Sequence, residues 1–225
     1  MKVQVLTLFP RLFDNFLQES IVGIAAEKGA LSVQLTDWRD YTTDRHRTVD
    51  DRPFGGGPGM VMKPEPIFAA VEDVLERSEN PGMPKILFTP QGRPMDQATA
   101  EWLSGEPEWM ALCGRYEGFD ERVHDGFDWH EVSLGPFVLS GGEVAAMALI
   151  EASTRLIPGV LGDEESARQD SFTDGRLDHP HYTRPRSFRG KDVPDVLLNG
   201  NHEEISTWRR AESERRTAEW RAATS

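Results

Sequence analysis

Apolar and mixed segments alternate along the chain up to about residue 157. Short, continuous apolar runs with the length and composition of buried strands occur at residues 3–9, 31–38, 85–90 and 109–113. Apolar positions at helical spacing occupy residues 10–29, 64–77 and 96–104, and Asp96 is a typical helix-capping residue. Because strand, helix and strand follow one another repeatedly, the pattern predicts an α/β fold built on a parallel sheet.

The pattern changes after residue 157, which predicts a second part of the chain. Residues 143–157 form the most regular helical segment, and Pro158 and Gly159 end it. Residues 160–180 are acidic and lack periodicity, whereas helix formers dominate the end of the chain. We therefore predict a first domain over residues 1–160, an interdomain linker over 161–180 and a helical domain over 181–225.

The net charge of −13 argues against a nucleic-acid partner when it is taken alone, since Lys and Arg dominate phosphate binding. The charge is unevenly distributed, however. Residues 181–225 hold nine Arg and Lys against seven Asp and Glu, a balance of +2, so residues 1–180 carry −15. This distribution is compatible with RNA binding and equally with a solvated helix face.

The single cysteine, Cys113, cannot form an intrachain disulfide, and its apolar surroundings predict a small core residue. The sequence contains no CxxC pattern, so it lacks this motif of structural zinc sites. No segment has the eighteen or so apolar residues of a membrane span, and the amino terminus lacks the cleavage pattern of a signal peptide. These features predict a cytoplasmic protein with no membrane partner.

Three glycine-rich segments follow predicted strands, at residues 54–60, 114–118 and 133–143. Ligands of open parallel sheets bind at the carboxyl ends of strands, where glycines allow the backbone to approach closely. Three such loops favour a nucleotide-like ligand over simple turns. The sequence has neither the GxxxxGK[ST] pattern of a phosphate-binding loop nor a GxGxxG pattern after a strand, so it lacks the motifs of ATPases and Rossmann dehydrogenases.

Two ionisable residues could support methylation of an amide-type nitrogen. Such a nitrogen has no available lone pair until its proton is removed, which requires a base, here Asp170, and a cation for the developing negative charge, here Arg155. The composition of the chain does not show whether these two residues act together in one site. Each also has a structural explanation, because Asp170 suits a solvated linker and Arg155 suits a helix end.

Several long strings in the sequence resemble the bacterial tRNA (guanine-N1)-methyltransferases of the trefoil-knot class. They are DDRPFGGGPGM (50–60), GRYEGFDERV (114–123), VLSGGE (138–143), RLIPGVLG (155–162), DSFTDGRLDHPHYTRP (170–185) and VLLNGNHEEISTWRR (196–210). They follow the family's order over nearly the whole chain. The resemblance implies a parallel α/β sheet with a deep trefoil knot, a small helical carboxy-terminal domain, and a homodimer whose sites combine residues of both chains.

The resemblance also implies S-adenosylmethionine as the methyl donor and a set of site residues. Its catalytic residues are Asp170 as general base, Arg155, and Glu117, which is associated with the donor's methionine end and with dependence on Mg²⁺. The implied cofactor-binding residues are Thr89, Pro90, Gly92, Gly114, Tyr116, Gly118, Ser133, Leu134, Gly135, Pro136, Phe137, Val138, Leu139, Gly141 and Gly142. Pro136 stands where the family usually has an aspartate. The carboxylate of that aspartate therefore has no counterpart in this sequence.

The expected reaction is methyl transfer to N1 of guanosine 37, just 3′ of the anticodon, after the base is turned out of its stack. The carboxy-terminal helices and the loop containing Arg45, His46, Arg47 and Arg52 would hold the anticodon arm. We expect the linker to become ordered when tRNA binds. The alternatives are methylation of a ribose 2′-hydroxyl, which leaves Asp170 without a role, and an RNA-binding protein without turnover.

Overall fold

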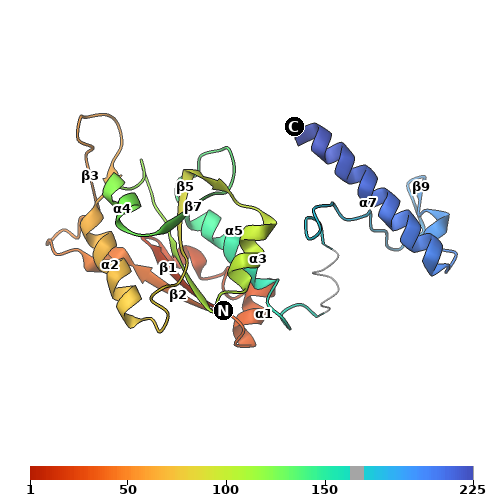
Figure 1. Ribbon diagram of the computed structural model, residues 1–225, viewed down its shortest axis with the longest axis horizontal. Helices are drawn as coiled ribbons and strands as arrows, with labels where there is room; N and C mark the ends of the chain where they lie inside the picture. The colour runs from red at the N-terminus through yellow and green to blue at the C-terminus, as the bar shows by residue number, and fades with distance from the viewer. Residues whose placement is uncertain (163–169, 225) are drawn as a thin grey trace. The chain divides into compact units, whose positions relative to one another are not determined.

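The computed structural model describes residues 1–162 and 170–224 of the chain (Figure 1). The chain divides into two compact units, Met1–Gly162 and Asp163–Ser225. This division falls close to residue 160, where the change of sequence pattern places the end of the first domain.

A five-stranded parallel sheet forms the centre of the first unit. Its strands are β1 (Lys2–Thr7), β2 (Ser32–Asp37), β5 (Lys85–Pro94), β6 (Glu108–Leu112) and β7 (Trp129–Ser133). They lie in the order β2-β1-β6-β5-β7, and each neighbouring pair is parallel. The predicted α/β class with a parallel sheet is therefore confirmed.

Helices cover both faces of this sheet and create two cores. They are α1 (Ser20–Glu27), α2 (Pro64–Arg77), α3 (Gln97–Ser104), α4 (Glu121–Gly126) and α5 (Glu143–Thr154). Figure 1 shows α2 and α4 on one side of the sheet and α1, α3 and α5 on the other. Trp109 of β6 enters the core under α5, while its neighbour Met110 enters the core under α2. All five residues of β6 are buried, which explains its continuous apolar run.

Local signals placed several of these elements correctly. Helix α2 spans Pro64–Arg77, as predicted. Asp96 caps α3, because its carboxylate accepts a hydrogen bond from the backbone N–H of Thr99 at 2.9 Å. Cys113 is fully buried at the end of β6, in agreement with its predicted core position.

The prediction of a single helix over residues 10–29 is wrong. The segment contains the short 3-10 helix η1 (Pro10–Phe13), a series of turns, and then α1. Ser20, the first residue of α1, has a φ of +55°, and backbone in this left-handed region cannot continue a right-handed helix. Apolar spacing alone does not reveal such an interruption, because both pieces contribute to the same core.

Irregular segments and two short strands complete the first unit. The 3-10 helix η2 (Trp38–Tyr41) follows β2, and β3 (Asp50–Asp51) pairs antiparallel with β4 (Val61–Met62). Strand β5 is longer than expected, because its pairing with β7 resumes after an irregularity between Phe88 and Arg93. The predicted strand end at residue 90 is therefore a bulge within a longer strand.

The sheet order inserts a late strand among early ones. Strand β6 lies between β1 and β5, although both precede it along the chain. The segment just before α5 lies against the start of the loop that follows β6. There the backbone N–H of Gly142 donates to the carbonyl oxygen of Gly114 at 3.1 Å. The sheet therefore does not grow by adding each strand at an edge, and the deep knot that the resemblance implies stays a prediction.

The second unit is organised around one long helix. It contains β8 (Ser187–Phe188) and β9 (Lys191–Asp192), which form an antiparallel pair, the 3-10 helix η3 (Asp195–Leu197), and helix α7 (His202–Thr224). Helix α7 is 23 residues long and strongly polar. Among the described residues, no helix is long and apolar enough to cross a membrane.

The predicted linker, residues 161–180, is only partly described, because residues 163–169 lie outside the described ranges. Its second half packs on α7. The backbone N–H of Leu177 donates to Thr217 Oγ1 at 2.9 Å, Ser213 Oγ donates to the carbonyl oxygen of Leu177 at 2.5 Å, and the ring of Phe172 contacts Trp220. The spacing of apolar residues could not reveal this packing. The hydrogen-bonding groups of this irregular backbone find their partners in side chains of a helix that is distant in the sequence.

Candidate functional site

A cavity of about 400 Å³ opens at the carboxyl ends of β5, β6 and β7. Three loops form its wall, one at the β5 bulge, one after β6 and one between β7 and α5. The lining residues are Phe88, Thr89, Pro90, Gln91, Gly114, Arg115, Tyr116, Glu117, Gly118, Phe119, Glu121, His124, Val132, Ser133, Leu134, Phe137, Val138, Leu139, Ser140, Gly141, Gly142 and Ala145. Its volume lies within the range of small-molecule sites.

Most of the residues that the sequence analysis assigns to cofactor binding line this cavity, and three do not. Gly92 packs against β7, where a Cβ would meet the backbone nitrogen of Val132 at 2.5 Å. Gly135 is covered by the ring of Phe137, and Pro136 is exposed outside the lining. The structure therefore gives Gly92 a packing role in the bulge.

The loop after β6 has a strained backbone and is held from outside the cavity. Tyr116 has a φ of +54°, which is unusual for a residue other than glycine. The backbone N–H of Glu117 donates to the carbonyl oxygen of Met60 at 3.1 Å, and that of Met62 donates to Gly118 at 2.9 Å. The glycine-rich segment 54–60 thus supports the cavity loop and does not line the cavity itself.

A buried ion pair joins the ends of two strands to the start of α5. Glu143, only 1% exposed, lies 3.0 Å from the guanidinium Nη2 of Arg115 and accepts a hydrogen bond from Thr7 Oγ1 at 2.8 Å. The guanidinium of Arg115 also lies over the ring of Phe9 at 4.4 Å. The sequence analysis did not single out either charged residue. The available signal was an acidic residue in the first turn of a mostly apolar helix.

Gly141 lies against this ion pair. A Cβ at Gly141 would come within 2.4 Å of Arg115 Nε and 2.5 Å of Glu143 Oε2, so a larger residue would displace the pair. The two-glycine sequence before α5 therefore allows the loop to pass close to the charged side chains. Cys113 lies against Gly142 and is not a lining residue of the cavity. Burial raises the pKa of its thiol well above the usual value, which keeps it protonated and unsuited to nucleophilic chemistry.

The mouth of the cavity exposes several apolar side chains. Phe137 is 54% exposed, Val138 84% and Tyr116 62%. Apolar side chains that gather on a surface indicate a contact with a ligand or another chain.

Arg155 and Asp170, the two residues expected to perform the chemistry, belong to different units. Arg155 is half-buried at the C-cap of α5, and its backbone N–H donates to the carbonyl oxygen of Glu151. Asp170 is half-buried at the start of the described part of the second unit, where its carbonyl oxygen accepts from the backbone N–H of Thr173 at 3.4 Å. Their association stays a prediction.

A parallel α/β sheet with a glycine-rich cavity at the carboxyl ends of its strands is an arrangement in which open sheets bind small ligands. The sequence profile described as tRNA (Guanine-1)-methyltransferase TrmD matches residues 1–224. The chain therefore belongs to this family of methyltransferases.

Curated relatives are similar along nearly the whole chain. The tRNA (guanine-N(1)-)-methyltransferase of Moorella thermoacetica is 54% identical over 221 residues, which cover 98% of this chain and 88% of the relative. That of Dehalococcoides mccartyi is 52% identical over 217 residues, covering 96% and 87%. That of Geobacter sulfurreducens is 56% identical over 210 residues, covering 93% and 85%.

Proposed function

We propose that this protein transfers the methyl group of S-adenosylmethionine to N1 of guanosine 37 in tRNA. The family and the names of its relatives support a tRNA guanine-N1 methyltransferase. The observation that carries the choice of donor is the cavity, whose three loops contain most of the residues that the resemblance assigns to donor binding.

The composition of the cavity wall fits such a donor. Leu134, Phe137 and Leu139 provide an apolar surface for a purine ring, while Gly114 and Gly141 contribute backbone to the same wall. Glu117 and Glu121 place carboxylates in the same wall. They would attract the positively charged end of the donor, and their oxygens are of the kind that Mg²⁺ prefers.

The donor supplies an electrophilic methyl group, and the protein supplies proton removal and charge stabilisation. Asp170 removes the proton from guanine N1, which makes its electron pair available for attack. Arg155 holds the negative charge that develops on O6. Neither role can be fulfilled unless the guanine leaves its stack and reaches the cavity.

The second unit provides the surface for tRNA. Exposed arginines occur before and within α7, including Arg184, Arg186, Arg189, Arg209 and Arg210. Guanidinium groups bind phosphates in a bidentate manner, so these residues are suited to hold the backbone of the anticodon arm. They lie in the part of the chain that is more basic than the rest.

Mapping the methylated nucleoside tests this proposal. Unmodified tRNA transcripts are incubated with the protein and labelled S-adenosylmethionine, and the product is digested and sequenced. We expect 1-methylguanosine at position 37 and no incorporation when guanosine 37 is replaced by adenosine. A methylated ribose hydroxyl would instead support the alternative reaction, and donor binding without incorporation would support an RNA-binding protein without turnover.

We also propose that two copies of the chain pair to form composite sites. The exposed apolar side chains at the cavity mouth, Phe137 and Val138, are suited to contact a second chain. Asp170 of one chain would then act with Arg155 and the cavity of the other.

Coexpression of two inactive variants tests the composite site. A dimer of an Asp170→Asn chain and an Arg155→Ala chain contains one intact site if the two residues act across the interface, so we expect it to recover about half of the wild-type activity. Each variant alone serves as the control, because its homodimer has two defective sites. A heterodimer as inactive as its parents contradicts the proposal.

A further inference from the structure

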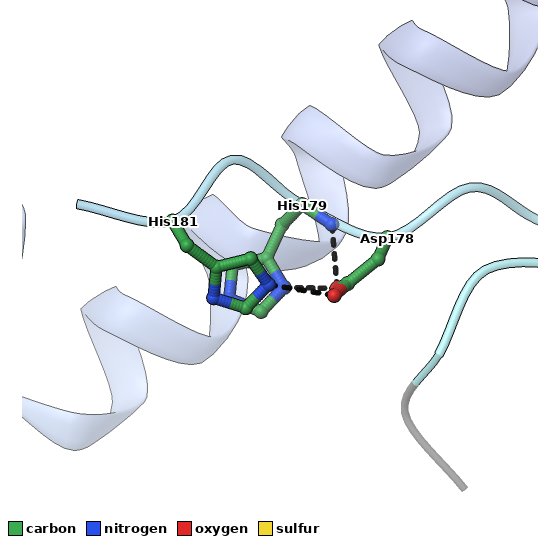
Figure 2. A group of neighbouring side chains, drawn as sticks. All are labelled: Asp178, His179 and His181. Atoms are coloured by element: carbon green, nitrogen blue, oxygen red, sulfur yellow. Dashed lines mark hydrogen bonds and ion pairs between the residues drawn. The ribbon is translucent and has the colours of Figure 1, made fainter. Parts of the chain in front are cut away.

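Three potential metal ligands lie together on the second unit, and none of them is a cavity-lining residue. Figure 2 shows Asp178, His179 and His181 with their side chains directed toward one another. Asp178 Oδ1 lies 2.6 Å from His179 Nδ1, and Oδ2 lies 2.6 Å from His181 Nε2. One potential ligand atom from each residue lies within 4.8 Å of the others. The two imidazole rings are adjacent, with their centroids 4.4 Å apart.

We propose that Asp178, His179 and His181 form a binding site for a transition-metal cation such as Zn²⁺. Two imidazoles and one carboxylate are a ligand set that zinc and related divalent ions accept, with the remaining position taken by water or a further ligand. Imidazole nitrogens favour these ions over Mg²⁺ and Ca²⁺, which prefer oxygen ligands.

The backbone that carries these ligands is hydrogen-bonded at Asp178 and at the residue before it. The backbone N–H of Asp178 donates to Ser171 Oγ at 2.9 Å, and the adjacent Leu177 is hydrogen-bonded through both its N–H and its carbonyl oxygen to α7. Pro180 separates the two histidines and restricts the backbone between them. The ligands are therefore attached to a frame that needs little ordering when an ion binds.

Coordination requires only small movements of these side chains. Two ligands of a tetrahedral zinc ion are roughly 3.4 Å apart, since each bond is about 2.0–2.1 Å long. Because the ligand atoms lie within 4.8 Å of one another, the widest separation closes by at most about 1.4 Å. The carboxylate–imidazole pair that shares the ion, now 2.6 Å apart, opens by about 0.8 Å. The side chain of His181 is 70% exposed and has the most freedom to rotate, whereas that of His179 is only 11% exposed. The incoming ion takes the place of the hydrogen bonds between the carboxylate and the rings.

Metal titration of the full-length protein tests the proposal. The protein is treated with a chelator, dialysed, and titrated with Zn²⁺ while bound metal is measured; Co²⁺ is then used as a spectroscopic probe. We expect one site per chain, a visible absorption band of Co²⁺ that Zn²⁺ removes, and no displacement by excess Mg²⁺.

Two ligand variants and a matched control decide whether these residues form the site. Loss of a residue that only supports a ligand costs about 10- to 100-fold in metal affinity, so loss of a direct ligand in His181→Ala is expected to cost at least about 100-fold. His181 is exposed, so its replacement leaves the fold intact, and His179→Asn provides a second test. His202→Ala removes an exposed histidine elsewhere in the same unit and serves as the control.

The proposal requires that His181→Ala and His179→Asn lose the site while His202→Ala retains it. Unchanged zinc affinity in both ligand variants overturns it, as does the absence of a stoichiometric site in the wild-type protein. None of these measurements depends on methyl transfer.

Discussion

Replacing Asp170 with Asn is expected to abolish methyl transfer while donor binding is retained. The amide has nearly the shape of the carboxylate but cannot accept the proton from guanine N1. Loss of a general base costs about 10²- to 10⁴-fold in rate. Single-turnover transfer with saturating tRNA measures the chemical step, and calorimetric titration with S-adenosylmethionine measures donor binding separately.

The chain offers a matched control for this substitution four residues away. Asp174 is exposed, and a hydrogen bond from the guanidinium of Arg176 lowers the pKa of its carboxyl. Asp174→Asn is expected to retain nearly the full transfer rate, since an exposed ion pair contributes little. If Asp170→Asn turns over as fast as Asp174→Asn, the base is a different residue.

Replacing Glu143 with Ala is expected to lower the free energy of unfolding of the first unit by about 3–5 kcal/mol. The substitution leaves Arg115 in a largely enclosed position without its counter-charge, and removal of one partner from a buried ion pair has an effect of this size. It also removes the acceptor of the Thr7 hydroxyl. Urea denaturation at fixed protein concentration, followed by tryptophan fluorescence, measures the change.

Glu151→Ala is the matched control, because Glu151 is an exposed residue of the same helix. Its replacement is expected to change the free energy of unfolding by no more than about 0.5 kcal/mol. The double variant that combines Glu143→Ala with Arg115→Ala removes both charges of the ion pair. It should recover part of the lost free energy of unfolding, because no unpaired charge then remains. Equal effects of Glu143→Ala and Glu151→Ala would show that the ion pair contributes nothing to stability.

The candidate site shows which of its parts a sequence can reveal. Loops such as 114–118 were found because glycines after apolar runs mark the ends of parallel strands. The resemblance supplied Asp170 and Arg155, which composition alone could not pair. Arg115 and Glu143 were missed, because charged residues are usually exposed and nothing local distinguishes a buried pair from two surface charges.

The sequence by itself determined the features that depend on short-range interactions. The α/β class follows from the alternation of apolar runs and helical segments, the extent of α2 from Pro64 and its apolar spacing, and the start of α3 from the capping by Asp96, whose partner Thr99 lies three residues away. Such signals act within one or two turns of the chain, so they can be recognised in a linear pattern.

Only the tertiary structure decided the contacts between distant segments. Thr7 and Glu143 are 136 positions apart, and Leu177 and Thr217 are 40 apart. Thr7 and Glu143 meet because the end of β1 and the start of α5 lie at the same edge of the sheet. Leu177 and Thr217 meet because the irregular backbone at Leu177 finds its hydrogen-bond partners on α7. Such contacts depend on the order of strands and the packing of helices, which local propensities do not encode.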